Sequence, residues 1–411
     1  MLKAVLLILA SVLMIRVQLA MGADPASGAS GTIRFFKVAS SDFDPFTKSA
    51  SATEQEWMRK HYWRMLTYSP YFDTRVAWFP NAWVYKDLYA IYVNSPQAQE
   101  HPEWILRDAA GSKLYIPFGC SRGGCPQYAA DVGNPAFRAY WIADARSRLR
   151  KGYRGLFVDD VNMMRSRVGD GSGRPVVPQD PRTGLQMTEP DWLRYMAEFS
   201  EQIRNAFPGA EIVHNVIWYA GHEDPRIQRE LLSADLINLE RGVNDTGLRG
   251  GAGPFGFETF LSFIDWLHEH GKGVMLDGKA SAGVGQEYAL AAYFLVGSGG
   301  DSIGNKLGGT PSDWWPGYDV TLGSPLGSRY GWNGVLRRDF EQGVVLVNEP
   351  DSRPQSLQVH GAFADASGDG CTAVTLGPAE GVVLSTRYGG GAVPRRRCDS
   401  HPTSGSSGSA R

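Results

Sequence analysis

The stretch "GYRGLFVDDVNMM", residues 152–164, carries an apolar run directly into two adjacent carboxylates. The run Gly155–Val158 has the composition of a strand that is buried on both faces, and Asp159 and Asp160 follow it with no turn residue between. Strands of this kind belong to parallel sheets covered by helices, in which functional side chains gather where the strands end. The stretch therefore predicts a parallel α/β fold with a polar site at the carboxyl ends of its strands.

Seven more short apolar runs lie on either side of this one, separated by longer helical patterns. Asn134 and Pro135 supply an N-cap and a first-turn proline for one helix, Thr188 and Asp191 resemble a capping box for another, and Gly271 closes a third. The eight predicted strands are 33–39, 63–69, 82–88, 154–160, 211–216, 235–241, 273–279 and 299–305. Alternating strands and helices on this scale predict a (β/α)8 TIM barrel. A doubly wound sheet is the alternative, but no G-x-G-x-x-G motif follows any of the strands.

The chain divides into four parts by composition. We expect a signal peptide over 1–23, the barrel over 32–330, a small antiparallel β-sandwich domain over 331–388 and a low-complexity tail over 389–411. The third part is predicted from "VLRRDFEQGVVLVNEP" and "GCTAVTLGPAEGVVLSTRY", which read as short strands with no helix between them. The apolar run at the start, Ala4–Ile15, is too short for a lasting bilayer span, although an uncleaved anchor is the alternative. We therefore expect a secreted protein, extracellular or periplasmic, with no stable membrane anchor, and a monomer.

The four cysteines agree with export. Cys120 and Cys125 bracket the Gly-rich loop "CSRGGC", while Cys371 and Cys398 flank the C-terminal segment. Four cysteines allow three pairings, and proximity favours Cys120–Cys125 and Cys371–Cys398. A metal site is the alternative, but paired C-x-x-C knuckles are missing. We expect two disulfides.

Charge and composition exclude some partners. There are 41 Lys and Arg against 43 Asp and Glu, giving a net charge of −2, and no dense basic segment of the kind that nucleic acid binding needs. No cofactor is expected. The supply of aromatic residues, with 12 Trp, 17 Tyr and 18 Phe, fits either a large aromatic core or a site that stacks on sugar rings.

Acidic residues recur at the strands. Asp159 and Asp160 end the fourth predicted strand, Glu240 the sixth and Asp277 the seventh, and Asp301 lies near the eighth. A single Asp after a strand is often a helix cap or an ion-pair partner. Several on successive strands are instead expected to converge on one barrel mouth. Glycoside hydrolysis needs such a set, because one carboxylate acts on the sugar carbon while a second, protonated carboxyl serves the leaving oxygen.

Two other kinds of chemistry are less well supported. A metal-assisted hydrolase could draw on Asp159, Asp160, His214 and Asn215, but the chain has eight His and no H-x-H or H-E-x-x-H pair. Serine chemistry lacks its G-x-S-x-G elbow.

The segment "DVGNPAFRAYWIADARSRLRKGYRGLFVDDVNM" resembles the fourth-strand region of bacterial barrel glycosidases. Together with "HPEWILRDAAGS", "PNAWVYKDL" and "EQGVVLVNEP", it is similar to hypothetical glycosyl hydrolases related to the α-amylase and α-galactosidase superfamily, over 33–388. The resemblance implies that Asp159 is the nucleophile and leaves the role of Asp160 open. The fifth strand ends in "HNV" rather than an acid, which shifts the acid role to Glu240. It also implies that the C-terminal β-domain supports the barrel.

Other residues at the same end are candidates for holding a sugar, although each also fits a structural ion pair or the core. Trp314 and Trp315 in "SDWWPGYD" are the favoured stacking platform. The candidate substrate-binding set is Tyr85, Lys86, Asn162, His214, Asn215, Trp218, Arg241, Lys279, Asp301, Trp314 and Trp315.

The sequence thus predicts a secreted glycoside hydrolase acting on a poly- or oligosaccharide, without naming the sugar or the linkage. A retaining mechanism is expected, with the carboxyls of Asp159 and Glu240 about 5–6 Å apart and Asp277 orienting the ring or stabilising positive charge. A separation of about 6.5–9.5 Å would indicate inversion. The alternative from another class is a non-catalytic carbohydrate-binding barrel.

Overall fold

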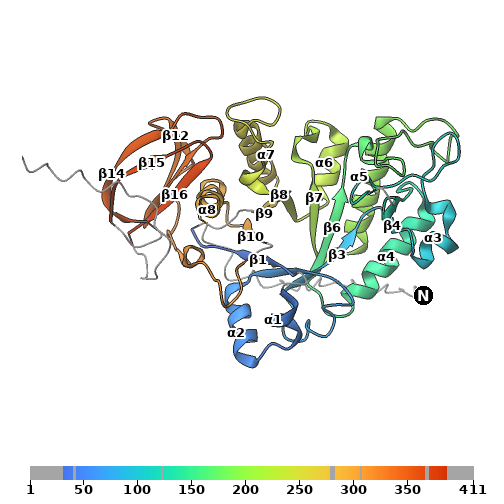
Figure 1. Cartoon of the computed structure of the whole chain (residues 1–411), viewed down its shortest axis with the longest axis horizontal. Coiled ribbons are helices and arrows are strands. Elements are labelled where there is room, and N and C mark those ends of the chain that lie inside the picture. The colour runs from blue at the N-terminus through green and yellow to red at the C-terminus, as the bar shows by residue number, and fades with distance from the viewer. Residues whose placement is uncertain are drawn as a thin grey trace, which may run out of the picture.

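The computed structural model describes residues 31–39, 43–121, 124–277, 283–305, 308–365 and 370–386. Its centre is a closed barrel in which every neighbouring pair of strands is parallel (Figure 1). All eight predicted strands are confirmed. In order around the barrel they are β1 (Phe35–Val38), β2 (Arg64–Thr67), β3 (Ala82–Asp87), β6 (Gly155–Val161), β7 (Glu211–Val216), β8 (Leu236–Glu240), β9 (Gly273–Asp277) and β10 (Ser302–Asn305).

Helices connect most of the strands and cover the barrel. The predicted caps are present: Asn134 Oδ1 accepts hydrogen bonds at the start of α4, and Thr188 forms a capping box with Asp191 at α5. Strands β2 and β3 are joined by turns alone, so one side of the barrel has no covering helix there. The helices are α1 (Asp44–Lys48), α2 (Ala52–His61), α3 (Pro96–Glu100), α4 (Pro135–Leu149), α5 (Glu189–Ala206), α6 (Pro225–Leu232), α7 (Phe257–Glu269) and α8 (Val284–Val296). None of the helices in the described ranges is long and apolar enough to cross a membrane.

Side chains alternate between the barrel interior and the helices, as strand geometry requires. On β6, Leu156 and Val158 pack toward the helices, whereas Phe157 faces inward. The interior cluster is formed by Phe36, Val38, Leu66, Trp83, Phe157, Val213, Leu236 and Met275. This filled interior means that a site can form only above it, at the open carboxyl end of the strands.

The amino end of the barrel is tied together by one carboxylate. Glu211, the first residue of β7, accepts hydrogen bonds from Arg64 Nη2 at 2.7 Å, Trp83 Nε1 at 2.9 Å and Arg154 Nε at 3.1 Å. Burial alone would raise the pKa of Glu211, but these donors outweigh it and lower the pKa to about 2. The network therefore joins β2, β3 and β7 at the end opposite the mouth.

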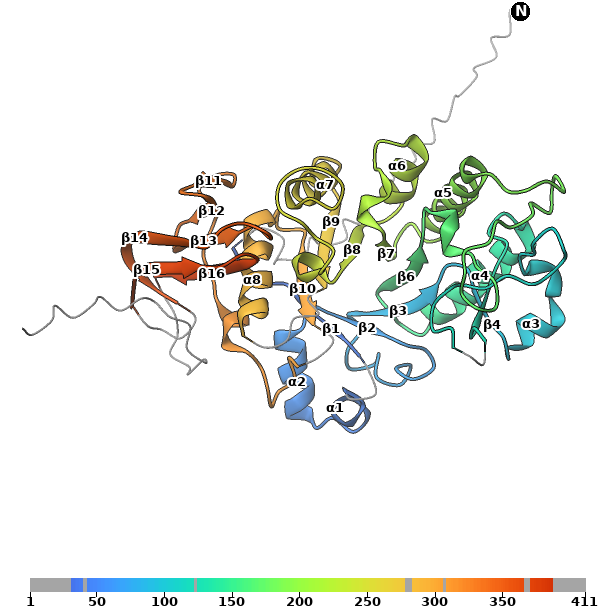
Figure 2. The same cartoon turned by 45° about the horizontal axis from the view of Figure 1, so that its top comes forward.

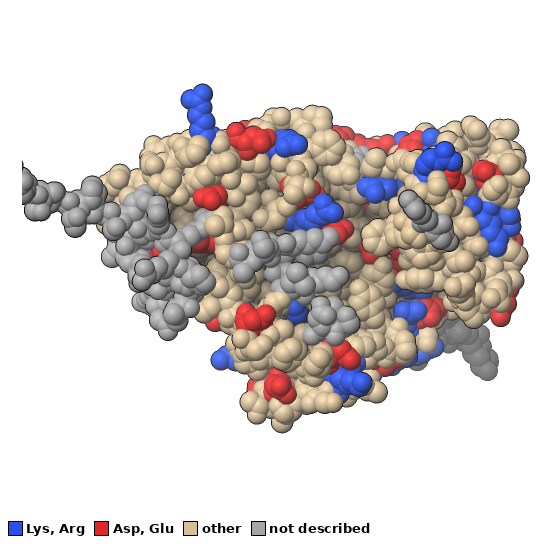
Figure 3. Space-filling view, viewed as in Figure 1, with Lys and Arg blue, Asp and Glu red and all other residues tan. Residues whose placement is uncertain are grey.

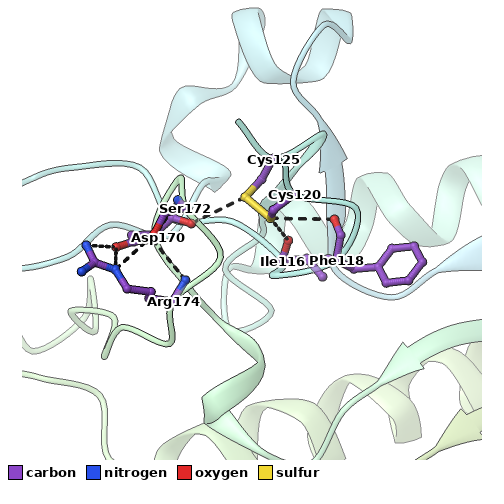
Figure 4. The surroundings of a disulfide bond; sticks show 7 residues. All are labelled: Ile116, Phe118, Cys120, Cys125, Asp170, Ser172 and Arg174. Carbon is purple, nitrogen blue, oxygen red and sulfur yellow. Dashed lines mark hydrogen bonds and ion pairs between the residues drawn. A yellow bond between two sulfur atoms is a disulfide. The ribbon is translucent and has the colours of Figure 1, made fainter. Parts of the chain in front are cut away.

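The excursion between β3 and β6 is long and carries a disulfide. It contains α3 and a hairpin of β4 (Ala90–Tyr92) and β5 (Gln127–Ala129). Cys120 and Cys125 are bonded, which confirms the first predicted disulfide; Figure 4 shows it close to the turn in which Asp170 holds Ser172 and Arg174. The partner predicted for Cys371 is Cys398, which lies outside the described residues, as do the predicted signal peptide and tail.

A second, antiparallel domain follows the barrel, as predicted. Its strands are ordered β11-β12-β13-β16-β14-β15. One face of β13 and β16 packs toward α8 through Val345 and Val383, and the other face, with Val344, packs on β14 and β15. Arg338 donates hydrogen bonds to three carbonyls at the end of α8, so this helix lies between barrel and β-domain (Figures 1 and 2). The strands are β11 (Tyr330–Trp332), β12 (Val335–Phe340), β13 (Gly343–Asn348), β14 (Gln355–Ala364), β15 (Gly370–Leu376) and β16 (Glu380–Ser385).

Candidate active site

Asp159 lies near the carboxyl end of β6, two residues after the inward-facing Phe157, and its carboxylate is held from three directions. Tyr85 Oη donates to Oδ2 at 2.7 Å, and Asn215 Nδ2 donates to Oδ1 at 2.7 Å. The backbone N–H of Asp160 also donates to Oδ1, at 2.8 Å. These donors come from β3, β6 and β7, so three adjacent strands fix the position of one carboxylate at the mouth.

The residues that hold Asp159 are themselves held. Tyr85 stacks on Phe157 with ring centroids 6.3 Å apart. Burial, followed by the charge of Asp159, raises the pKa of Tyr85, so its hydroxyl stays protonated and remains a donor. Asn215 in turn accepts a hydrogen bond from Asn238 Nδ2 at 2.9 Å, which extends the chain of contacts to β8. Its carbonyl oxygen is thereby engaged, which leaves the amide nitrogen to face Asp159.

Asp160 departs from the strand's alternation. Its φ is +55°, in the left-handed region that few residues other than glycine adopt, and the pairing with β7 shifts register between Val158 and Val161. Its carboxylate accepts a hydrogen bond from Asn162 Nδ2 at 3.0 Å. The bulge therefore lets two adjacent acids reach different neighbours, which a regular strand would not allow.

A third acid, Asp87, completes this group, and the sequence analysis did not single it out. It is the last residue of β3 and pairs in register with Asp159. It is buried, and its Oδ1 accepts the backbone N–H groups of Tyr89 and Ala90 at 2.8 and 2.7 Å. The signal was present in the sequence, because Asp87 ends the third apolar run much as Asp159 ends the fourth.

The two neighbours of Asp159 have altered acidity. Burial raises the pKa of Asp87 well above its ordinary range, and the charges of Asp160 and Asp159 raise it further. Burial, and then the charge of Asp159, also raise the pKa of Asp160. Burial and the neighbouring carboxylates therefore both favour the protonated forms of Asp87 and Asp160.

Glu240 lies one layer of inward-facing side chains nearer to the open end of the barrel than Asp159. It is exposed at the end of β8 and follows Asn238 by two residues, on the same face of the strand. Asn238 pairs in register with Asn215. Glu240 is two residues beyond Asn238, so its backbone is about 6–7 Å nearer to the carboxyl end of the barrel than the backbones of Asn215 and Asn238. Strands β6 and β8 are separated by β7, which places their backbones about 9–10 Å apart. The backbone of Asp277 pairs with that of Glu240, whereas its side chain lies outside what is described.

Two of the predicted sugar contacts face away from the mouth. Lys86 follows Tyr85 and so points to the other side of β3, where its Nζ pairs with Asp144 of α4 at 2.6 Å. His214 precedes Asn215 and is fully buried behind β7, with Nδ1 2.6 Å from Glu230. Strand alternation explains both corrections, because neighbouring residues cannot share a face.

Asp301 is a correction of another kind, since it precedes β10 instead of ending it. It lies at the amino end of the barrel, where Oδ1 is 2.8 Å from His268 Nε2 and accepts the backbone N–H of Val274 at 2.8 Å. Burial by itself would raise the pKa of Asp301, but the contact with His268 outweighs it and the pKa is lowered. Asp301 is therefore a structural residue, remote from the mouth.

The predicted aromatic platform is also corrected. Trp314 is half-buried and packs edge-on against Phe35 and Trp57, with ring centroids 5.0 and 5.4 Å away, and Trp315 packs on Tyr318. These rings pack against the core beside α2 and are only partly exposed.

Other rings do reach solvent near the mouth. Trp218 follows β7 and contacts Tyr219, which contacts Phe255 at 4.7 Å between ring centroids. Tyr219 and Phe255 are both exposed. Of the remaining candidates, Asn162 is buried where it holds Asp160.

Arg241 is exposed and directly follows Glu240, with a left-handed φ of +68°. Lys279 lies outside the described residues.

The surface and the side-chain clusters limit other functions. On the face shown in Figure 3, basic and acidic side chains are interspersed, with no continuous basic patch. In the part of the chain that the structure describes, no three His, Cys, Asp or Glu side chains form a group suited to a metal ion.

Residues 65–229 match the model of a family described as hypothetical glycosyl hydrolase family 15. The matched segment runs from β2 into α6 and includes Asp87, Asp159, Asp160 and Asn215. A search of curated protein sequences gives no significant match. Over these residues, which are fewer than half of the chain, the match agrees with the predicted resemblance to glycosyl hydrolases.

Solved structures with a similar fold include several glycoside hydrolases. An enzyme described as family GH13_31 has a TM-score of 0.51 at 11% identity, with 86% of this chain and 99% of that chain covered. An α-amylase from Lactobacillus plantarum has a TM-score of 0.46 at 11% identity, over 85% and 98% of the two chains. The α-galactosidase from Lactobacillus brevis has a TM-score of 0.47 at 10% identity, over 91% and 57%. At 11% identity, the likeness to the GH13_31 enzyme supports only the assignment of the fold.

Proposed function

We propose that this protein is a secreted glycoside hydrolase that cleaves an O-glycosidic bond of a polysaccharide or oligosaccharide, with Asp159 as nucleophile and Glu240 as general acid and base. The observation that carries the proposal is the fixation of Asp159 by Tyr85, Asn215 and its own neighbour at the mouth of a barrel that matches a glycosyl hydrolase model. A nucleophile needs such rigid placement, because a small misplacement costs much of the rate.

In the proposed first step a carboxylate oxygen of Asp159 attacks the anomeric carbon. The bond from that carbon to the leaving oxygen breaks, and protonated Glu240 gives its proton to this oxygen. A glycosyl ester of Asp159 results. In the second step Glu240, now ionised, takes a proton from water as the water oxygen attacks the same carbon and releases Asp159. The product keeps the configuration of the substrate.

The placement of Glu240 is compatible with its proposed role. It is exposed, so a leaving group and then a water molecule can approach it, and it lies across the mouth from Asp159 with one strand between. The backbones are about 9–10 Å apart across the strands and about 6–7 Å apart along them, or about 11–12 Å in all, and both side chains must lean inward to bring the carboxyls to about 5–6 Å. Asp277, whose backbone pairs with that of Glu240, is proposed to stabilise positive charge on the sugar.

The acids behind Asp159 are proposed to act indirectly. The pKa values of Asp160 and Asp87 are raised beside the nucleophile, which limits the negative charge near Asp159 before the substrate arrives. They do not touch the sugar in this scheme. Export is supported by the apolar, small-residue-flanked N-terminal segment and by the Cys120–Cys125 disulfide, since disulfides persist in oxidising compartments.

A hydrolysis screen tests the proposal. The mature protein is incubated with a panel of plant, fungal and bacterial glycans, and new reducing ends are measured for the wild type and for Asp159→Asn, Glu240→Gln and Asp265→Asn. Asp265 is a matched control, because it lies on α7 and pairs with Arg329.

The expected result is release of reducing ends by the wild type and by Asp265→Asn, with a loss of at least about a thousandfold in the other two variants. Binding of a glycan with no hydrolysis would contradict the proposal and identify a non-catalytic carbohydrate-binding barrel. Activity retained in Asp159→Asn would reject the assignment of the nucleophile.

A further inference from the structure

A cavity of about 270 Å³ lies beside the proposed active site, on the outer side of β3. Its walls come from the end of β2, from β3, from β4 and α3 of the long excursion, and from α4. Of these elements, α3, α4 and β4 lie together at one end of the molecule in Figures 1 and 2. The chain between β2 and β3 has no helix. The excursion and α4 therefore enclose this space beside a part of the barrel that no helix covers.

The cavity shares two walls with the proposed active site. Tyr85, whose hydroxyl donates to Asp159, lines it, and so does Tyr68. The rings of Tyr68 and Tyr85 have centroids 5.0 Å apart. Tyr68 is close enough to Asp159 for that charge, after burial, to raise the pKa of Tyr68. The cavity therefore borders the residues that hold Asp159.

The lining combines flat rings with fixed polar groups. Tyr92 at the rim is 55% exposed, and Trp104 and Tyr140 lie deeper, with ring centroids 5.1 Å apart. Polar groups on the wall include Gln97 and Ser95 of the α3 region. Rings that meet C–H faces and side chains that meet hydroxyls are the two requirements for holding a sugar.

The charges of the wall are largely balanced among themselves. Asp144 pairs with Lys86 Nζ at 2.6 Å and with Arg148 Nε at 2.9 Å. These groups are fixed before any ligand arrives and can exchange hydrogen bonds with hydroxyls, without requiring a strongly charged ligand.

We propose that this cavity is a sugar-binding subsite, which takes one pyranose ring of the substrate next to the ring cleaved at Asp159. The proposal rests on the proposed function. The volume limits the occupant, because pockets for small molecules run from roughly 300 to 1,000 Å³ and this one is slightly smaller. One ring fits, and an extended chain does not. Lys86 then contacts the substrate from the outer face of β3.

The test uses methyl glycosides of glucose, galactose, mannose, N-acetylglucosamine and glucuronic acid as probes, with binding followed by saturation-transfer NMR. Three variants are compared with the wild type. Gln97→Trp fills the cavity from the surface of α3, Tyr92→Ala removes an exposed ring, and Asp159→Asn alters the catalytic carboxylate. Far-ultraviolet circular dichroism checks that each variant is folded.

At least one probe should bind the wild type with a saturable signal. Gln97→Trp should abolish that signal, and Tyr92→Ala should weaken the affinity roughly two- to tenfold, the effect of one stacking ring. Asp159→Asn should leave the affinity within about twofold, since Asp159 does not line the cavity. No binding by any probe, or binding that survives in both Gln97→Trp and Tyr92→Ala, would overturn the inference.

Loss of binding in Asp159→Asn, with Gln97→Trp unaffected, would place the ring at the catalytic carboxylate instead. That outcome rejects the subsite and leaves the proposed hydrolysis intact. Conversely, cavity binding in a protein that hydrolyses no glycan would reject the proposed function alone.

Discussion

Glu211→Gln should destabilise the protein by about 3 kcal/mol at pH 7. The contacts of Glu211 with Arg64, Trp83 and Arg154 lower its pKa to about 2, against an ordinary value of 4.5, despite burial. At about 1.4 kcal/mol for each pKa unit, the preference of the folded state for the ionised form is about 3 kcal/mol. Because the pKa is lowered on folding, this stability is complete above about pH 4.5 and is lost as the pH falls through about 2.

Urea unfolding of the wild type and the variant at pH 7 and pH 3 measures this difference. The loss in the variant should be about 3 kcal/mol at pH 7 and less than half of that at pH 3. Glu56→Gln is the control, because Glu56 forms an exposed pair with Arg59 and should change stability by no more than about 0.5 kcal/mol. Equal losses at the two pH values would refute the reasoning, since they would show that the charge of Glu211 is not what stabilises the fold.

Three further predictions concern other parts of the molecule. Asp87→Asn should become more stable relative to the wild type as the pH rises from 4.5 to 8, by at most about 1.4 kcal/mol per pH unit. The reason is that the raised pKa of Asp87 makes the wild type take up a proton when it folds in this pH range, which the variant does not do. A difference in stability that does not change with pH would contradict this. Asn215→Ala should lower kcat about 10- to 100-fold by removing a hydrogen bond to the carboxylate of Asp159, with a urea unfolding curve as the control that the variant is still folded under assay conditions; an unchanged kcat would show that this bond does not serve the reaction. Peptide mapping without reduction should find Cys371 joined to Cys398, and either cysteine as a free thiol would contradict that pairing.

The barrel could be predicted from the sequence because its signals are local. Most apolar runs are separated from the next by a helical pattern, some with a clear cap, as at Asn134 and Thr188, and the structure has strands and helices at those places. The connection from β2 to β3 is the exception, since it contains turns alone. The direction of β6 alone was enough to predict that Asp159 lies at the carboxyl end of the barrel. Asp301 was misplaced because the eighth strand is weakly apolar, so that its start and its end could not be distinguished.

Which side chains share a face was harder to predict. His214 and Asn215 are adjacent, and strand alternation lets only one of them face the interior, but the sequence does not say which. The bulge at Asp160 depends on a left-handed backbone that no glycine marks, and Trp314 is half-buried against rings from β1 and α2 that lie far away in sequence. These features arise from tertiary contacts, which a single sequence does not show.

The most direct measurement is the identity of the residue that becomes glycosylated. In Glu240→Gln, dinitrophenyl glycosides need no acid to leave, so the first step can proceed, whereas the second step lacks its base and is slow. The variant is mixed with a panel of these glycosides, quenched in acid and examined by intact-mass and peptide mapping. We predict a mass increase of one glycosyl unit, located on Asp159. Burst release of dinitrophenol with the adduct on Asp160 or another residue, or steady release with no adduct at all, would contradict the assignment of Asp159 as the nucleophile.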